Sequence, residues 1–197
     1  MKVDIVCEDG YDFALYGIGL SYGLTSDMSF DEYCMSLEIK DRMYDVSCKL
    51  AHKDGGHNKF LEHISISMII DAPRYWWSQF DTYRVGITKN SESTMHTILK
   101  TPIKPYMFEG FDFDETIPNS TINRLEILRQ NKNWRQLKRE LPESFIQRRC
   151  VKISYMNLRN IIRQRKNHRL IEWEYFCNEV MDQIKYPEYL KDILDKK

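Results

Sequence analysis

The stretch from His63 to Phe80 constrains the fold of this chain more than any other. Its first half, "HISISMIIDAP", is rich in β-branched residues and alternates as a strand does, and Pro73 should end that strand. Three consecutive aromatic residues, Tyr75 to Trp77, follow at once and predict a helix of about ten residues in the core. We therefore expect a sheet strand that leads directly into a buried helix, which then presents the polar segment after it.

Further strand and helix patterns fill the rest of the chain. Ser29 and Glu32 form a capping box, which predicts the start of one long amphipathic helix that the glycines of "DGG" at 54–56 end. Strands are predicted over 2–8 and 150–155, and helices over 12–23, 119–142 and, as one or two helices, 156–184. Residues 101–118 are predicted to be an irregular, proline-containing connection. Without repeats or an obvious linker, the simplest expectation is one α+β domain over residues 1–197.

Composition narrows the range of possible functions. Lys and Arg number 29, as do Asp and Glu, so the formal net charge is zero and no global field attracts nucleic acid or an anionic membrane. No apolar run approaches the roughly 20 residues of a membrane-spanning helix. The five cysteines form no C-x-x-C pair, which indicates reduced thiols and argues against thiolate-bound zinc. We expect a cytoplasmic protein with no metal, no nucleic-acid partner and no membrane association.

Two polar clusters could carry chemistry. In "GGHNKFLEH", His57 and His63 straddle a turn with one nearby carboxylate, Glu62, a poor arrangement for zinc or iron. These histidines either satisfy loop backbone groups or contact a nucleotide or cofactor. The second cluster follows the aromatic helix and is either a solvated loop or a site that the helix holds rigidly. It comprises Gln79, Arg84, Asn90, Ser91, Glu92, Ser93 and Thr94.

A third cluster is basic. Arg159 and Arg163 lie one helical turn apart on one face, and arginine forks match phosphate bidentately. The alternative is a basic helix that only faces solvent. No glycine-rich phosphate loop accompanies the cluster, so P-loop and dinucleotide-binding folds lack support. Its members are Arg148, Arg149, Arg159, Arg163, Arg165, Lys166 and Arg169.

Taken in order, these segments resemble the flavin-dependent thymidylate synthases. That family carries a GH…EH segment before a strand, then a helix that ends in an R-H-R triplet with a serine shortly after it, and later an N-x-R helix with a downstream WE. The matching residues here are Gly56-His57 with Glu62-His63, "DAPRYWWSQFDTYRVGITKNSEST", and Asn157-Leu158-Arg159 with Trp173-Glu174. The resemblance covers residues from about 55 to 180, and "LSYG" at 20–23 is similar to an N-terminal segment of the family.

The R-H-R triplet falls on Thr82, Tyr83 and Arg84, so this chain keeps only the last arginine. The spacing from Arg84 to Ser93 is one residue longer than in the family, and Met95 stands where the family has a phosphate-binding arginine. Two lost charged hydrogen bonds, each worth roughly 1.5–3 kcal/mol, would weaken a ligand by more than about a hundredfold. The basic run "RQRKNHR" at 163–169 could compensate for the loss.

The resemblance implies an antiparallel sheet flanked by long helices and a homotetramer with active sites between subunits. It implies FAD as cofactor and one-carbon transfer to C5 of a pyrimidine deoxynucleotide such as dUMP, with methylenetetrahydrofolate and NADPH as co-substrates. Implied cofactor contacts are His63, Thr82, Tyr83, Arg84, Asn90, Glu92, Asn157, Arg159 and His168. Implied catalytic residues are Ser93, Gln79 and Arg165, and implied substrate contacts are Gln79, Ser93, Arg149, Arg165 and Arg169. The late helix is about two residues shorter than in the family, so the family's late-helix arginine corresponds to either Arg165 or Arg169.

Two other functions stay open. One is a related flavin enzyme that acts on a different nucleotide, and the other is a non-catalytic nucleotide-binding homotetramer that has lost flavin chemistry. Because Tyr83 cannot carry the charge of a histidine near neutral pH, we expect a protein that binds a flat heteroaromatic ligand but methylates dUMP poorly. Size and divergence suit a virus-encoded protein, for example from a phage, in the host cytoplasm.

Overall fold

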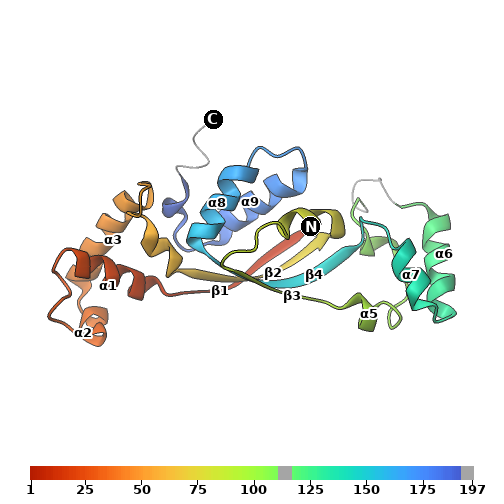
Figure 1. Ribbon diagram of the computed structural model, residues 1–197, viewed down its shortest axis with the longest axis horizontal. Helices are drawn as coiled ribbons and strands as arrows, with labels where there is room; N and C mark the ends of the chain where they lie inside the picture. Colours follow the sequence, from red (N-terminus) through yellow and green to blue (C-terminus); the bar gives the residue numbers. More distant parts are fainter. Residues whose placement is uncertain (111–116, 192–197) are drawn as a thin grey trace. The chain divides into compact units, whose positions relative to one another are not determined.

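The computed structural model describes residues 1–110 and 117–191. Within them, a four-stranded antiparallel sheet has the order β1-β2-β4-β3 (Figure 1). Its strands are β1 (Lys2–Asp9), β2 (Ser65–Pro73), β3 (Ile87–Ser91) and β4 (Ile146–Ser154). Buried and half-buried residues alternate along β2 because successive side chains of a strand point to opposite faces. The predicted α+β class with an antiparallel sheet is therefore confirmed.

The chain divides into two compact units, and each strand contributes residues to both. The first unit contains residues 1–3, 69–85 and 89–151. The second contains residues 4–68, 86–88 and, among those described, 152–191. The single domain expected over residues 1–197 stays a prediction.

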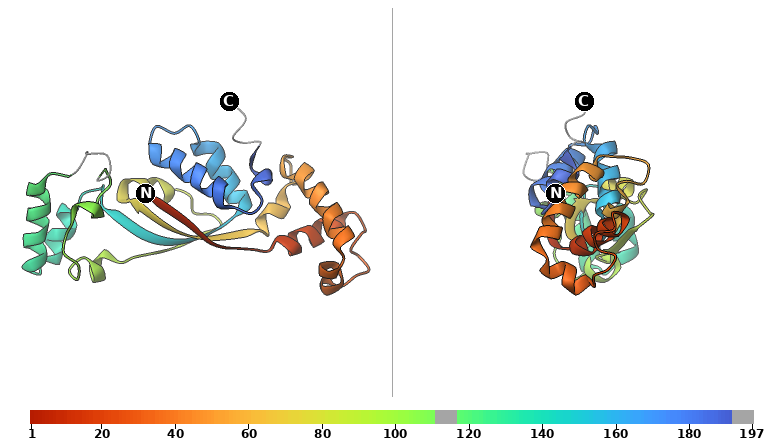
Figure 2. Two further views of the ribbon diagram at one scale, coloured as in Figure 1. Left: turned by 180° about the vertical axis from the view of Figure 1, so that it is seen from behind. Right: turned by 90° about the vertical axis from the view of Figure 1, so that its left-hand side faces the viewer.

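The helices of the second unit come from both ends of the chain. They are α1 (Tyr11–Ser21), α2 (Phe30–Met35), α3 (Leu37–Ala51), α8 (Tyr155–Arg165) and α9 (Ile171–Gln183), with short 3-10 helices at Lys59–Glu62 (η1) and Pro187–Tyr189 (η4). Helix α1 packs against α3 and η1, and α8 packs against α9, as Figures 1 and 2 show. Tyr33, Met43, Leu61, Tyr155 and Trp173 are fully buried in this unit.

The prediction of one long helix that starts at Ser29 is wrong in one respect, because the segment forms two helices. The capping box itself is confirmed: Ser29 Oγ accepts a hydrogen bond from the Glu32 main-chain nitrogen, and the Glu32 carboxylate accepts from the Ser29 nitrogen at 2.6 Å. Ser36, with φ −91° and ψ 93°, leaves the helical conformation and separates α2 from α3. Serine favours such boundaries because its hydroxyl competes for nearby backbone groups. Helix α3 ends at Ala51, before the glycines at 55 and 56, which lie in the following turn.

The first unit holds the aromatic segment and a separate helical pair. Its helices are α4 (Arg74–Phe80), α5 (Thr94–Thr97), α6 (Asn119–Gln130) and α7 (Trp134–Glu140), with a 3-10 helix at Pro105–Met107 (η2). Helices α6 and α7 pack side by side over a core that includes Leu125, Leu128, Leu137 and Phe145 (Figure 2).

Three boundaries in the first unit differ from those predicted. The single helix expected over 119–142 is two helices, because Lys132 adopts a positive φ of 54° and Asn133 then caps α7 through Gln136. Helix α4 has 7 residues, shorter than predicted, and β4 begins four residues before Cys150. In the predicted irregular connection at 101–118, η2 is the one helical turn among described residues, and 111–116 lie outside the described part.

Among the described residues, no helix combines the length and the apolar character that crossing a membrane requires.

Candidate functional site

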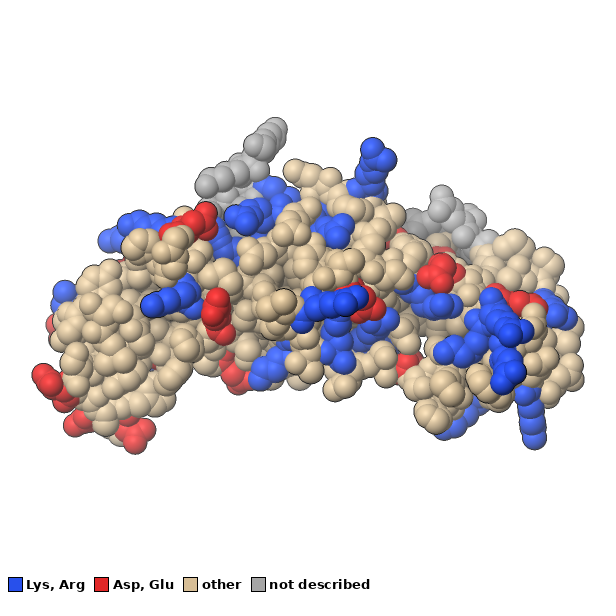
Figure 3. Space-filling model, viewed as in Figure 1, with Lys and Arg blue, Asp and Glu red and all other residues tan. Residues whose placement is uncertain are grey.

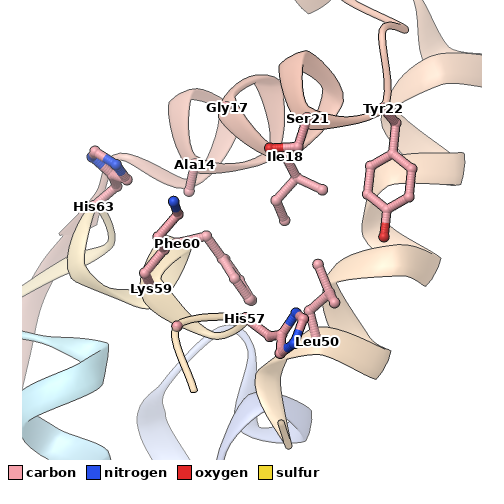
Figure 4. A pocket seen from close by; sticks show the side chains of 11 residues that line it. Ala14, Gly17, Ile18, Ser21, Tyr22, Leu50, His57, Lys59, Phe60 and His63 are labelled. Carbon is pink, nitrogen blue, oxygen red and sulfur yellow. The ribbon is translucent and has the colours of Figure 1, made fainter. Parts of the chain in front are cut away.

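The second unit contains a pocket of about 390 Å³ between α1 and the segment that leads into β2 (Figure 4). Helix α1 forms one side, η1 and the turn before it form the other, and Leu50 reaches in from α3. The lining residues are Ala14, Gly17, Ile18, Ser21, Tyr22, Leu50, Gly56, His57, Lys59, Phe60 and His63. The GH…EH segment and the "LSYG" segment, which are far apart in the sequence, therefore meet in one pocket.

Gly10 sets the distance between the two sides of the pocket. It precedes α1 with φ 88°, a backbone conformation that residues other than glycine rarely adopt. A Cβ atom at Gly10 would overlap the main-chain oxygen of His63. Glycine thus lets the start of α1 approach the end of the histidine segment closely, which brings the Phe13 and His63 rings to 5.3 Å in an edge-on arrangement.

The pocket combines an apolar floor with a rim that carries titratable and cationic groups. Ile18 and Phe60 are buried, whereas His57, Lys59 and His63 are exposed. No carboxylate is among the lining residues, so the ammonium of Lys59 faces no opposing charge within the lining. A flat apolar surface beside a cation and two imidazoles suits an anionic heteroaromatic ligand. Among the described residues, no group of three or more His, Cys, Asp or Glu side chains is placed to hold a metal ion.

In the first unit, the aromatic helix anchors a polar cluster of three elements. The Trp77 indole nitrogen donates to the main-chain oxygen of Gln147 at 2.9 Å, which joins α4 to β4. The Arg149 guanidinium lies over the Trp77 ring, donates to Gln147 Oε1 and contacts both carboxylate oxygens of Asp81. Lys89 of β3 pairs with the same carboxylate at 2.9 Å. Partial burial would raise the pKa of Asp81, but the hydrogen bonds from Lys89 and Arg149 outweigh it and lower that pKa.

The degenerate triplet forms the turn between α4 and β3. Thr82 Oγ1 donates to the main-chain oxygen of Gln79 at 2.7 Å, and the ring of Tyr83 meets the edge of Phe80. Arg84 is exposed, and its side chain makes no hydrogen bond or ion pair with any described residue. The segment after Arg84, expected to be a loop, is instead mostly strand β3, because its alternating half-buried residues pair with β4.

The remaining residues of the predicted site in the first unit lie at or near the end of β3. Asn90 is an exposed residue of the strand, and the Glu92 nitrogen donates to the Arg148 main-chain oxygen at 2.9 Å. The main-chain oxygen of Glu92 accepts a hydrogen bond from Gln147 Nε2. Ser93 is exposed and occupies the N-cap position of α5. Glu92 and Arg149 are therefore linked through the side chain of Gln147.

The predicted residues of the late helices lie in the second unit and have unlike environments. Asn157 Nδ2 donates to the Gly86 oxygen at 3.4 Å. Arg159 is only 6% exposed and donates to the Ala51 oxygen at the end of α3, so it is not the surface neighbour of Arg163 that the helical spacing predicted. Arg165 lies over the Trp173 ring, the Nδ1 atom of His168 accepts from the Leu170 nitrogen, and Arg169 is exposed.

Sequence reasoning missed several partners of these residues. Asp81 pairs with Arg149 and Lys89 pairs with Asp81, and both lie inside the matched aromatic segment but outside its R-H-R triplet. Their signal was weak but present, since Asp81 directly precedes the triplet and Lys89 alternates with exposed residues of β3. Lys59 and Phe60 lie inside the quoted histidine segment, but no role was assigned to them.

Comparisons with known proteins identify the fold. No model of a protein family matches the sequence, and no curated protein matches it. Solved structures do match: one of thymidylate synthase X from Helicobacter pylori with FAD and dUMP has 16% identity, a TM-score of 0.73 and complete coverage of both chains. A second, of the flavin-dependent thymidylate synthase of Helicobacter pylori complexed with FAD and dUMP, has 16% identity and a TM-score of 0.71, and the match covers 98% of this chain and 99% of that one. The chain thus has the fold of the flavin-dependent thymidylate synthases, as the resemblance predicted.

Proposed function

We propose that this protein binds FAD and a pyrimidine deoxynucleotide such as dUMP, and that it descends from enzymes that transfer a one-carbon unit to C5 of dUMP. The observation that carries the proposal is the match in fold over the whole chain to structures that contain both ligands. The motif segments add support, because the GH…EH and "LSYG" segments line a common pocket.

The residues of this chain suit a flavin in their chemistry. The pocket offers an apolar wall for a flat ring, with Lys59, His57 and His63 at its rim and no carboxylate in its lining. Arg84, Arg163 and Arg169 are exposed, and their side chains make no hydrogen bond or ion pair with described residues, so they are available to phosphate groups. Such a fit depends on orientation and electrostatics, which the protein supplies, whereas the flavin when bound supplies the hydride.

We propose the following roles for the predicted site residues. Cofactor contacts are assigned to His63, Thr82, Tyr83, Arg84, Asn90, Glu92, Asn157, Arg159 and His168, and nucleotide contacts to Gln79, Ser93, Arg149, Arg165 and Arg169. Gln79, Ser93 and Arg165 are proposed to orient the pyrimidine during the reaction. A homotetramer is part of the proposal, since it would allow Arg84 and Ser93 of one subunit to meet Arg149 or Arg159 of another.

Thr82, which is exposed, stands at the first arginine position of the triplet, and Tyr83 stands at its histidine position. These two replacements favour weak catalysis over full activity. Neither side chain provides the cation that a phosphate or a flavin carbonyl would contact. A second candidate is therefore a nucleotide-binding homotetramer without flavin chemistry, and a third is a related flavin enzyme with another nucleotide substrate.

The visible absorption band of flavin in the purified protein tests cofactor binding directly. A thermal-shift screen with dUMP, dCMP and FAD tests nucleotide binding, and conversion of dUMP to dTMP with NADPH and methylenetetrahydrofolate tests activity. We expect bound flavin, stabilisation by dUMP and little turnover. Replacing Tyr83 by His should raise turnover by roughly tenfold or more if the lost histidine limits the rate. Absence of binding to FAD and to every nucleotide would leave the fold without the function.

A further inference from the structure

The helical pair α6–α7 concentrates positive charge that the neutral total of the chain hides. Residues 119–141 contain six basic and two acidic residues, whereas residues 10–51 contain three basic and seven acidic residues. Figure 3 shows Lys and Arg side chains gathered over the region where Figure 1 places α6 and α7. Both acidic residues of the pair are already occupied, since Glu140 binds Arg124 and Glu126 binds Arg129.

The cations that remain lie on one face of α7. With 3.6 residues per turn, Trp134, Lys138, Arg135 and Arg139 follow one another around about 140° of the helix surface. Leu137, on the other side, is fully buried in the core of the unit. The three cationic residues are exposed, and Trp134 keeps 40% of its surface exposed. Their side chains, and that of Lys132, form no ion pair with any described residue.

This arrangement is unfavourable for the isolated helix. Arg135 and Arg139 are four residues apart and repel each other, as like charges at that spacing do. Lys132 and Arg135 also lie at the start of α7, where the positive end of the helix dipole disfavours cations. Helix-dipole complementarity explains Lys138 and Arg139 in the last turn, but it does not explain the two cations at the other end.

Lys132 carries a second unfavourable feature. It is the only non-glycine residue with positive φ among the described residues, at φ 54°. Its nitrogen donates to the Arg129 oxygen and the Asn133 nitrogen donates to the Leu128 oxygen, which together form the helix-ending motif that normally places glycine at this position. A lysine thus occupies a strained position next to the cationic face, and such outliers concentrate at functional sites.

We propose that this face, Lys132, Trp134, Arg135, Lys138 and Arg139, binds single-stranded nucleic acid. Three cations on α7 and Lys132 just before it neutralise successive phosphates, and Trp134 offers an exposed ring on which a base can stack. The Arg135 guanidinium lies over that ring, 5.9 Å from its centre, so the cation and the ring are close enough to contact one nucleotide. Charge complementarity favours a polyanion, and the exposed indole favours unpaired bases over a duplex.

Fluorescence anisotropy of the full chain with a labelled single-stranded DNA of about 20 nucleotides, and with RNA of the same sequence, measures binding. An excess of dUMP is present throughout, which separates this surface from the proposed nucleotide site. The other tryptophans, Trp76, Trp77 and Trp173, are fully buried, so quenching of intrinsic fluorescence by the unlabelled oligonucleotide reports on Trp134.

The test variant is R135Q/K138Q/R139Q, and its matched control is R42Q/K49Q/K53Q, which changes the same net charge at exposed residues of the second unit. The test variant should bind roughly tenfold or more weakly, and its salt slope should fall by about 2, given about 0.7 for each phosphate contact. The control should bind within about twofold of the parent. Trp134→Phe should keep most affinity but lose the quenching.

Five results would overturn the proposal. The first is that the parent protein binds neither the DNA nor the RNA strand at moderate salt, and the second is that the test and control variants lose affinity equally. The third is tighter binding of a duplex than of a single strand, and the fourth is equal competition by polyglutamate without quenching. Either result would exclude base stacking on Trp134 and identify a surface that binds any polyanion. A change in sedimentation of the test variant without any change in nucleic-acid affinity would identify the face as a contact between copies of this chain.

Discussion

The guanidinium carbon of Arg149 lies 4.3 Å from the centre of the Trp77 ring, and one of its nitrogens donates to both carboxylate oxygens of Asp81 at 2.9 and 3.0 Å. Arg149 belongs to β4, while Trp77 and Asp81 belong to α4 and its end. Arg149, which is proposed to bind the nucleotide, therefore also joins helix α4 to strand β4. A substitution of Arg149 should therefore affect both stability and ligand binding, and the two effects have to be measured separately.

Replacing Arg149 by Ala should lower the free energy of unfolding by about 1–3 kcal/mol, because it removes the ring contact and several charged hydrogen bonds at once. Arg148, its neighbour in β4, provides the control. It is 61% exposed and pairs with Asp71, so Arg148→Ala should cost less than about 1 kcal/mol. Urea denaturation measures the free energy of unfolding of both variants, and equal losses would contradict the role of Arg149 in joining α4 to β4.

Arg84 and Arg159, both proposed to bind an anionic ligand, should respond differently to replacement by Ala. Arg84 is exposed, so its loss should weaken FAD or nucleotide binding by roughly tenfold and leave the melting temperature unchanged. Arg159 is buried and donates to the Ala51 oxygen, so its loss should also lower stability by about 1–3 kcal/mol. Isothermal titration and thermal denaturation of both variants make the comparison. Unchanged affinity in both would exclude them from the ligand site.

Gly10 directly precedes α1 and Gly17 lies within it, so alanine substitutions at these two glycines can be compared. Gly10→Ala should destabilise the protein by about 1–3 kcal/mol or more, since it combines a positive φ with a clash against the His63 oxygen. Gly17 is helical and has open space around its would-be Cβ atom, so Gly17→Ala should stabilise by up to about 1 kcal/mol. Opposite shifts in melting temperature are expected. Shifts of the same sign would mean that the close approach of α1 to His63 is absent.

The cysteines should differ sharply in reactivity. Burial, with a smaller contribution from Glu174, raises the pKa of the Cys177 thiol to about 12, whereas Cys7 and Cys150 are exposed. Because the thiolate is the nucleophile, iodoacetamide at pH 8 should modify the two exposed residues and spare Cys177 in the native protein. Peptide mass spectrometry locates the adducts, and denatured protein, in which all sites react, is the control. Rapid modification of Cys177 in the native state would show that α9 is not packed as described.

Acid should weaken the α6 region through Glu126. Hydrogen bonds from Arg129, and smaller contributions from the Ile103 nitrogen and Gln130, outweigh partial burial and lower the pKa of Glu126 from 4.5 to about 2. Because the pKa of Glu126 is lower in the folded state, its ionised carboxylate contributes its full stabilisation above about pH 4.5. That stabilisation is lost as the pH falls toward 2. Screening by solvent limits the effect to about 1 kcal/mol. Glu126→Gln should flatten this part of the pH–stability curve, and the exposed Glu143→Gln, as control, should not.

The sequence by itself determined the elements whose signals are local. The alternation and terminal Pro73 of β2 and the capping box at Ser29 all act between residues a few positions apart, so they were recognisable without coordinates. The ordered motif segments also led to the correct fold at 16% identity to the solved structures. The histidine segment was identified as a possible site, although its partners in α1 were only weakly indicated by the "LSYG" match.

Tertiary structure decided the rest, because packing rewards contacts that no sequence spacing records. Helical periodicity continues through Ser36 and Lys132, yet both leave the helical conformation, so that α2 packs against α3 and α6 packs against α7. Helical spacing placed Arg159 on a basic face, but the chain buries it against the end of α3, 108 residues away in sequence. Asp81 became the partner of Arg149 across 68 residues. Local patterns report where a strand or helix can form, whereas only the folded chain determines which charges are paired, buried or left to bind a ligand.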